Sequence, residues 1–171
     1  MTTSYDAGGS GHGKDRTFLS RSAEETERIG ADLGRRLRGG DCILLSGELG
    51  SGKTTFLRGL ARGLGIADLG GVHSPSYTLV NHYSGTIDLA HIDAYFMNSS
   101  EDLELCGFDD SLAAGQVVAV EWADRIAERF PDAPTLPPGA IDVRMTLVSV
   151  EERRILIDPW PPIGGSIGGA H

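Results

Sequence analysis

The chain has 171 residues, of which 40% are hydrophobic and 23% charged, as expected for one globular domain whose core needs no disulfides. Its formal net charge of -9 disfavours a broad surface for nucleic acid or anionic membrane, because neutralising phosphates requires clustered Lys and Arg. A local basic patch stays compatible with this charge. Two cysteines, Cys42 and Cys106, fit a reducing cytoplasm, and no apolar run has the length of a signal peptide core or membrane span.

Three segments are predicted from composition. Residues 1–16 and 160–171 are rich in Gly and Ser or Pro, and we expect them to form disordered arms around a folded domain at residues 17–159. Within that domain a short edge strand is expected at Thr17 to Leu19. Ser22 and Glu25 form a capping box, and the helix that follows carries apolar residues at helical spacing up to Leu37, before Gly39-Gly40 ends it.

The remaining elements alternate between strand and helix patterns. Cys42 to Leu45 and Val117 to Val120 are continuous apolar runs, which is typical of strands buried on both faces. Helices are expected from Lys53 to about Gly63 and over residues 101–105 and 123–129, and further strands over residues 77–83, 87–93, 141–150 and 153–158. This pattern predicts the α/β class, as a mixed, mainly parallel sheet flanked by helices, with some antiparallel pairing toward the end.

A phosphate-binding loop follows the first buried strand. The segment from Gly47 to Thr54 matches G-x-x-x-x-G-K-[ST] in full, between an apolar strand and an amphipathic helix. Its glycines let backbone N–H groups approach phosphates, and the helix directs its positive dipole end at the same anion. The motif predicts ATP and Mg²⁺ as ligands, with Lys53 on the β- and γ-phosphates and Thr54 on the metal. The candidate nucleotide-binding residues are Gly47, Glu48, Leu49, Gly50, Ser51, Gly52, Lys53, Thr54 and Thr55.

Such a loop requires a carboxylate that positions the metal at the end of a neighbouring strand. Glu121 ends the apolar run from Val117, and Asp93 ends a run interrupted by Asp88 and His91. We expect Glu121 at the metal and Asp93 near the γ-phosphate or attacking water, although spacing alone does not assign the two roles. Trp122 follows directly, and either stacks near the nucleotide or fills the core.

These motifs resemble the TsaE family, formerly YjeE, of small bacterial P-loop ATPases required for threonylcarbamoyladenosine formation in tRNA. The resemblance spans about Ser22 to Ile157. It is carried by the loop through Phe56, by Ser74-Pro75-Ser76-Tyr77-Thr78-Leu79-Val80, by His91-Ile92-Asp93-Ala94-Tyr95, by Glu104 with Gly107, and by Val120-Glu121-Trp122.

The resemblance implies a P-loop NTPase fold and an accessory ATPase that acts on a complex of TsaB and TsaD, reaching tRNA only through that complex. It implies that the segment from Ser74 to Val80 is a switch loop with Thr78 as its hydroxyl, and that hydrolysis depends on Asp93 and Glu121. More weakly, it places Ser22 to Thr26 near the adenine. The acidic net charge fits docking to protein partners better than direct binding of RNA.

Two residues depart from the family pattern, which usually has Thr at Ser76 and Arg at Phe96. If that arginine contacts nucleotide or a partner, another cation such as Arg58 or Arg125 must replace it. Two alternative functions fit the loop: a small-molecule kinase, for which we find no arginine-bearing lid segment, and a nucleotide-gated binding module that does not hydrolyse ATP.

Overall fold

The computed structural model describes residues 15–75, 78–99, 101–129 and 137–162, and the predicted disordered arms lie mostly outside these ranges. Where they overlap, the first strand begins at Arg16, and Trp160 is buried, with its ring centroid 5.1 Å from that of Phe18. The folded part therefore extends beyond the predicted domain of residues 17–159 at both ends, to Arg16 and to Trp160. In the described part, none of the helices is long and apolar enough to span a bilayer.

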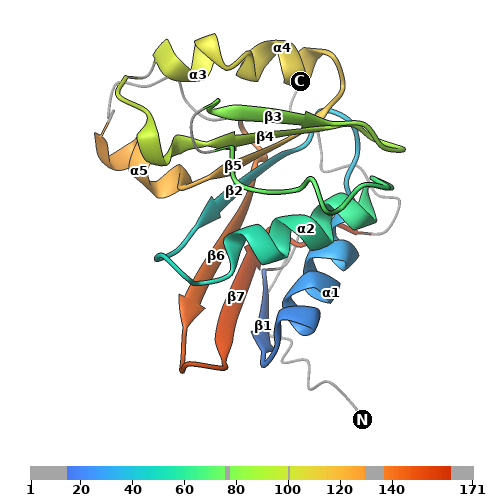
Figure 1. Cartoon of the computed structure of the whole chain (residues 1–171), viewed down its shortest axis with the longest axis vertical. Helices are drawn as coiled ribbons and strands as arrows, with labels where there is room; N and C mark the ends of the chain where they lie inside the picture. The colour runs from blue at the N-terminus through green and yellow to red at the C-terminus, as the bar shows by residue number, and fades with distance from the viewer. Residues whose placement is uncertain (1–14, 76–77, 100, 130–136, 163–171) are drawn as a thin grey trace.

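A seven-stranded mixed sheet forms the centre of the molecule, in the order β1-β7-β6-β2-β5-β4-β3 (Figure 1). The four strands β6, β2, β5 and β4 are mutually parallel, whereas β1, β7 and β3 pair antiparallel toward the two edges. The strands are β1 Arg16–Ser20, β2 Cys42–Ser46, β3 Val80–Tyr83, β4 Leu89–Asp93, β5 Val117–Glu121, β6 Ile141–Leu147 and β7 Arg153–Asp158.

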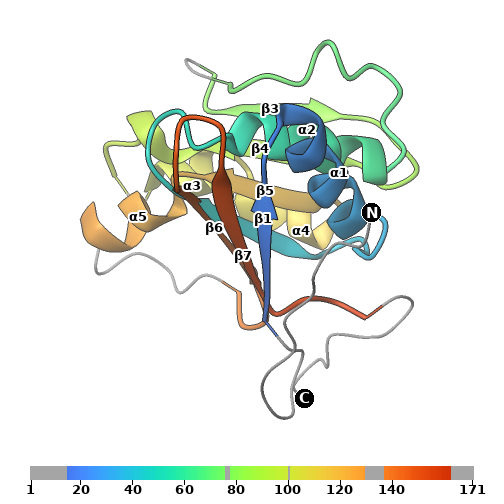
Figure 2. The ribbon, with the colours of Figure 1, turned by 90° about the horizontal axis from the view of Figure 1, so that it is seen from below.

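Helices cover both faces of this sheet, which explains why β4 and β5 are buried at every residue. Helices α1 and α2 lie side by side on one face, and α3, α4 and α5 pack on the other (Figures 1 and 2). The helices are α1 Ala23–Gly34, α2 Lys53–Gly63, α3 Glu101–Leu105, α4 Phe108–Ala113 and α5 Ala123–Arg129, with a 3₁₀ turn η1 at Ala94–Phe96. The α/β class is confirmed.

Some boundaries differ from the predictions. Helix α1 ends at Gly34, because the N–H groups of Arg36 and Leu37 bond only three residues back and tighten the chain into a turn that still buries Leu37. Strand β3 begins at Val80, because Leu79 has φ 63° in the left-handed region and interrupts the extended backbone. Strand β6 ends at Leu147, where a tight turn leads into β7. The short helix α4 was not predicted.

Candidate active site

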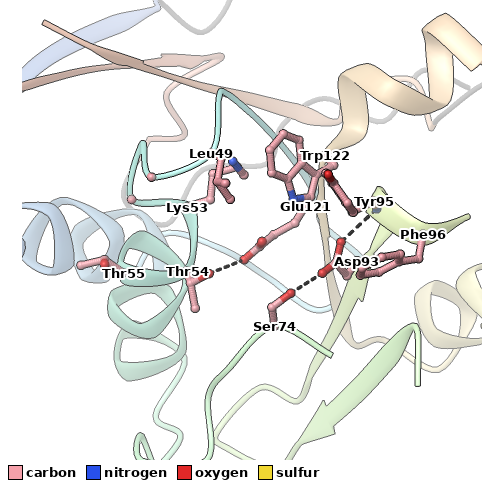
Figure 3. A pocket seen from close by; sticks show the side chains of 12 residues that line it. Leu49, Lys53, Thr54, Thr55, Ser74, Asp93, Tyr95, Phe96, Glu121 and Trp122 are labelled. Atoms are coloured by element: carbon pink, nitrogen blue, oxygen red, sulfur yellow. Dashed lines mark hydrogen bonds between the residues drawn. The ribbon is translucent and has the colours of Figure 1, made fainter. Parts of the chain in front are cut away.

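A cavity of about 530 Å³ opens where β2, β4 and β5 end. This is the edge at which parallel α/β sheets bind ligands, because the loops after neighbouring parallel strands converge there. Figure 3 shows the side chains around it, which come from the β2–α2 loop, the first turn of α2, the segment before β3, and the ends of β4 and β5. The lining residues are Leu49, Gly50, Gly52, Lys53, Thr54, Thr55, Ser74, Asp93, Tyr95, Phe96, Glu121 and Trp122.

The loop between β2 and α2 requires glycine at two positions for different reasons. Gly47 has φ 141°, and a Cβ built there would lie 2.3 Å from the carbonyl oxygen of Met145 on the neighbouring strand. Gly52 has φ 100° and caps α2 in the left-handed conformation, which turns the chain directly into the helix. The first N–H groups of α2 have no partner within their own helix, so they are available to an anion in the cavity.

Lys53 is the cation of this site and is only 5% exposed. Its Nζ donates to the carbonyl oxygens of Gly47 at 2.7 Å and Glu48 at 3.0 Å, and lies 3.6 Å from the centroid of the Trp122 ring. Burial lowers the pKa of Lys53, and nearby carboxylates, Glu121 foremost, partly offset that shift. A buried ammonium held by carbonyls and a ring gains strongly from an added anionic partner.

The two candidate carboxylates are direct neighbours in the sheet, since Asp93 on β4 pairs in register with Glu121 on β5. Both are less than 5% exposed. The Glu121 Oε1 atom accepts from the Thr54 hydroxyl at 3.2 Å, which joins it to the phosphate-loop helix. Asp93 accepts from the Ser74 hydroxyl and, at 2.9 Å, from the Tyr95 N–H (Figure 3). The structure thus gives the two acids different partners, which spacing alone did not assign.

The chemistry of these donors fits a nucleotide with Mg²⁺. The Thr54 hydroxyl lies beside the Glu121 carboxylate. Both are hard oxygen ligands of the kind that Mg²⁺ takes together with phosphate oxygens. The described residues contain no cluster of three or more His, Cys, Asp or Glu that would hold a metal by themselves. A shared site, in which phosphate completes the coordination, therefore fits better than an all-protein metal cage.

An aromatic wall, defined as Tyr95, Phe96 and Trp122, closes one side of the cavity. The Tyr95 ring lies 4.9 Å from Phe96 and 5.0 Å from Trp122, and Phe96 is 52% exposed. Trp122 has φ 61°, a left-handed conformation that is rare for a large side chain and is found where surrounding structure imposes it. Its ring lies against the Lys53 ammonium, so Trp122 lines the site, and it is also partly buried against the core cluster on the α3–α5 side of the sheet.

The two candidate replacement cations are placed differently. Arg58 on α2 pairs with Glu27 of α1 at 3.2 Å, on the side of the helix that faces α1. The guanidinium of Arg125 lies 4.2 Å from the Tyr95 centroid and 5.3 Å from that of Trp122, so it is held by the aromatic wall. Arg125 is the better placed of the two.

Other predicted site residues lie outside the cavity. The Thr78 hydroxyl donates to the Pro75 carbonyl at 2.9 Å, and Thr78 is not among the lining residues; Ser74, which we did not single out, turns its hydroxyl inward in its place. Gly47, Glu48 and Ser51 belong to the loop without lining the cavity. The segment from Ser22 to Thr26 caps α1, with the Ser22 hydroxyl accepting from the Glu25 N–H at 3.1 Å.

Comparison with known proteins identifies the family of this chain. The family model described as threonylcarbamoyl adenosine biosynthesis protein TsaE matches residues 20–155, which include every residue that lines the cavity. The chain belongs to the TsaE family. A tRNA threonylcarbamoyladenosine biosynthesis protein TsaE of Treponema pallidum is 40% identical over 67% of this chain and 83% of its own length. The TsaE of Mycobacterium leprae is 34% identical over 83% of this chain and 89% of its own length.

A solved structure extends the TsaE likeness to the fold. The crystal structure of YdiB from Bacillus subtilis has a TM-score of 0.65 and 30% sequence identity, covering 86% of this chain and 87% of that chain. The family resemblance in the sequence motifs is therefore confirmed, at the level of both sequence and fold.

Proposed function

We propose that this TsaE-family protein is a Mg²⁺-dependent ATPase of the cytoplasm that acts on a TsaB–TsaD complex during threonylcarbamoyladenosine formation in tRNA. The observation that carries the proposal is the convergence of Lys53, Thr54, Asp93 and Glu121 on one cavity, at the start of a helix that follows a glycine loop. Family membership favours the tRNA-modification pathway, and the site chemistry favours ATP with Mg²⁺.

Each residue has a distinct role in this proposal. Lys53 and the first N–H groups of α2 bind the phosphates, while Thr54 and Glu121 hold the metal. Bound Mg²⁺ would neutralise charge on the phosphate oxygens. Asp93, which is linked to Ser74 and to the backbone of the aromatic wall, orients the attacking water or the segment near the γ-phosphate. Thr78 would reach the γ-phosphate only after the segment around it moves, since its hydroxyl is bonded to Pro75.

Hydrolysis by the isolated chain should be slow. A guanidinium at the transferred phosphate contributes several orders of magnitude to the rate in enzymes that have one. Here Arg58 is engaged by Glu27, and Arg125 stacks on the aromatic wall and is not one of the lining residues. We therefore propose that the partner complex either supplies a cation or repositions Arg125.

The test is ATP hydrolysis with Mg²⁺ by the chain alone and with TsaB and TsaD of the same organism, with Lys53→Ala as control. We expect a low rate alone, a higher rate with partners, and loss of both in the control. With tRNA and an activated threonylcarbamoyl donor added, tRNA modification in the same mixtures should require the wild-type chain. Tight ATP binding without stimulation by partners would contradict the accessory role, and a phosphorylated small-molecule product would indicate a kinase.

A further inference from the structure

His91 is a buried polar residue that the proposed function leaves unused. It lies on β4, two residues before Asp93, so the two side chains share the face of the sheet covered by α2. The side chain is fully buried, and neither ring nitrogen has a hydrogen-bond partner among the described residues. A polar group left unsatisfied in a core costs about 1–3 kcal/mol, so an aliphatic residue would be the more stable choice for packing alone.

The carboxylate of Glu121 lies beside this ring. Its Oε1 atom lies 3.3 Å from the His91 Nε2 atom, a contact within donor–acceptor range but without the alignment of a hydrogen bond. The same Oε1 atom accepts from the Thr54 hydroxyl at 3.2 Å. The Glu121 carboxylate therefore lies between two side chains. The Thr54 hydroxyl, itself a candidate metal ligand, is on the helix side, and the buried His91 ring is on the sheet side.

We propose that His91 is a positioning residue, whose Nε2–H holds the Glu121 carboxylate from the sheet side so that it is preset for Mg²⁺. This inference rests on the proposed function, because it assigns Glu121 to the metal. Hydrogen bonds at such sites are often poorly aligned without ligand and tighten in the complex, which fits the 3.3 Å contact. Because a hydroxyl can face a metal with a lone pair and still donate its proton, Thr54 could keep its bond to Oε1, and His91 would restrain the same carboxylate from the opposite side.

Matched substitutions separate this role from simple packing. His91→Gln keeps an N–H near the position of Nε2, whereas His91→Asn carries its amide closer to the backbone, out of reach of Glu121. His91→Leu fills the volume without any donor, so a folding defect in either the Asn or the Leu variant leaves the other to carry the test. His82→Asn, on the exposed residue of strand β3, is the control for a histidine away from the site.

The measurement is the affinity of the full chain for ADP by calorimetry, in EDTA and across a series of Mg²⁺ concentrations. We expect all variants to bind ADP in EDTA within about twofold of wild type, because the phosphate loop is untouched. His91→Asn and His91→Leu should raise the Mg²⁺ concentration that gives half of the metal-dependent tightening about 10- to 100-fold, the usual loss when a metal ligand loses its supporting residue. His91→Gln and His82→Asn should stay near wild type.

Two results would overturn the inference in distinguishable ways. If Asn and Leu variants keep the wild-type Mg²⁺ midpoint, or lose ADP affinity equally with and without Mg²⁺, His91 is a structural residue and the proposed function stands. If wild-type protein shows no metal-dependent tightening, or Lys53→Ala binds ADP as well as wild type, the proposed site itself fails and the role of His91 fails with it.

Discussion

Substitution of Gly59 by alanine should strongly destabilise the packing of α2 on α1. A Cβ built at Gly59 lies 2.0 Å from the carbonyl oxygen of Glu27 and 2.8 Å from its Cα, both backbone atoms of α1 that cannot rotate away. Gly30 of α1 meets the carbonyl oxygen of Phe56 at 2.2 Å in the same way, so the two helices touch along their backbones. Helix α2 is also held by the side chains of Phe56 and Leu60, which are both fully buried in the core.

The expected cost follows from two opposing terms. Alanine gains about 1 kcal/mol over glycine in helix propensity, while overpacking typically costs about 1–3 kcal/mol and more when backbone must move. Because ordinary contact begins near 3.4 Å, the helices must separate by more than an ångström, which places the cost at the upper end. We expect a net loss of about 2 kcal/mol, equivalent to a fall in the melting temperature of about 4 to 8 °C.

Circular dichroism of thermal and urea unfolding measures this change directly. Gly70→Ala is the matched control, because a Cβ at Gly70 meets only the Asp68 side chain, at 3.4 Å. That variant should unfold within about 0.5 kcal/mol of wild type, as is usual for surface positions. A Gly59→Ala protein as stable as wild type would show that the close crossing of α1 and α2 is not as tight as described, and the reasoning from backbone contact would fail.

Three further outcomes follow from other parts of the fold. Burial raises the pKa of Cys42 from 9.0 to about 12, so above pH 9 the unfolded chain releases a proton that the folded chain keeps. The free energy of unfolding should therefore fall by up to about 1.4 kcal/mol per pH unit between about pH 9 and 12, and urea titrations at pH 8 and 10 should show a smaller fall in Cys42→Ala. Ser22→Ala removes the hydroxyl that caps α1 and should lower the free energy of unfolding by about 1 kcal/mol in the same urea assay. An unchanged urea midpoint would show that the cap does not stabilise the fold. In a Trp160→Phe variant, Trp122 is the only tryptophan, so the fluorescence emission reports on its surroundings. Binding of ADP should change this emission, because the phosphates draw the Lys53 ammonium away from the Trp122 ring, whose centroid it approaches to 3.6 Å. Constant emission on saturation with ADP would contradict that movement.

The sequence predicted the elements better than their arrangement. Continuous apolar runs are found in β2 and β5 because both faces of a central strand are covered. Ser22 and Glu25 mark the start of α1 because the Ser22 hydroxyl accepts from the Glu25 N–H, and the Glu25 carboxylate accepts from the Arg21 N–H just before the cap. The strand order and the pairing of Asp93 with Glu121 depend on contacts between distant segments. No local periodicity encodes these contacts.

The hydroxyl that faces the cavity from the segment before β3 shows why site residues are harder to predict than strands. The spacing from Ser74 to Val80 offers several hydroxyl groups, and the family pattern favours Thr78. Which one faces the cavity depends on the backbone, and the left-handed conformation of Leu79 lies between Thr78 and the strand that begins at Val80. In this structure the Thr78 hydroxyl donates to the Pro75 carbonyl, and the Ser74 hydroxyl donates to Asp93.

Asp93 also links the cavity to the surface of the molecule. Its N–H donates to the Leu79 carbonyl at 2.9 Å, one carboxylate oxygen accepts from Ser74, and the other accepts from the Tyr95 N–H at the start of η1. One residue thus contacts the segment before β3, the cavity and the turn that carries Tyr95 and Phe96. Phe96 is 52% exposed where the family usually has arginine. In the proposed function, a shift of the segment before β3 toward bound nucleotide would therefore act on this exposed aromatic surface through Asp93, and so could carry the nucleotide state to the proposed partner.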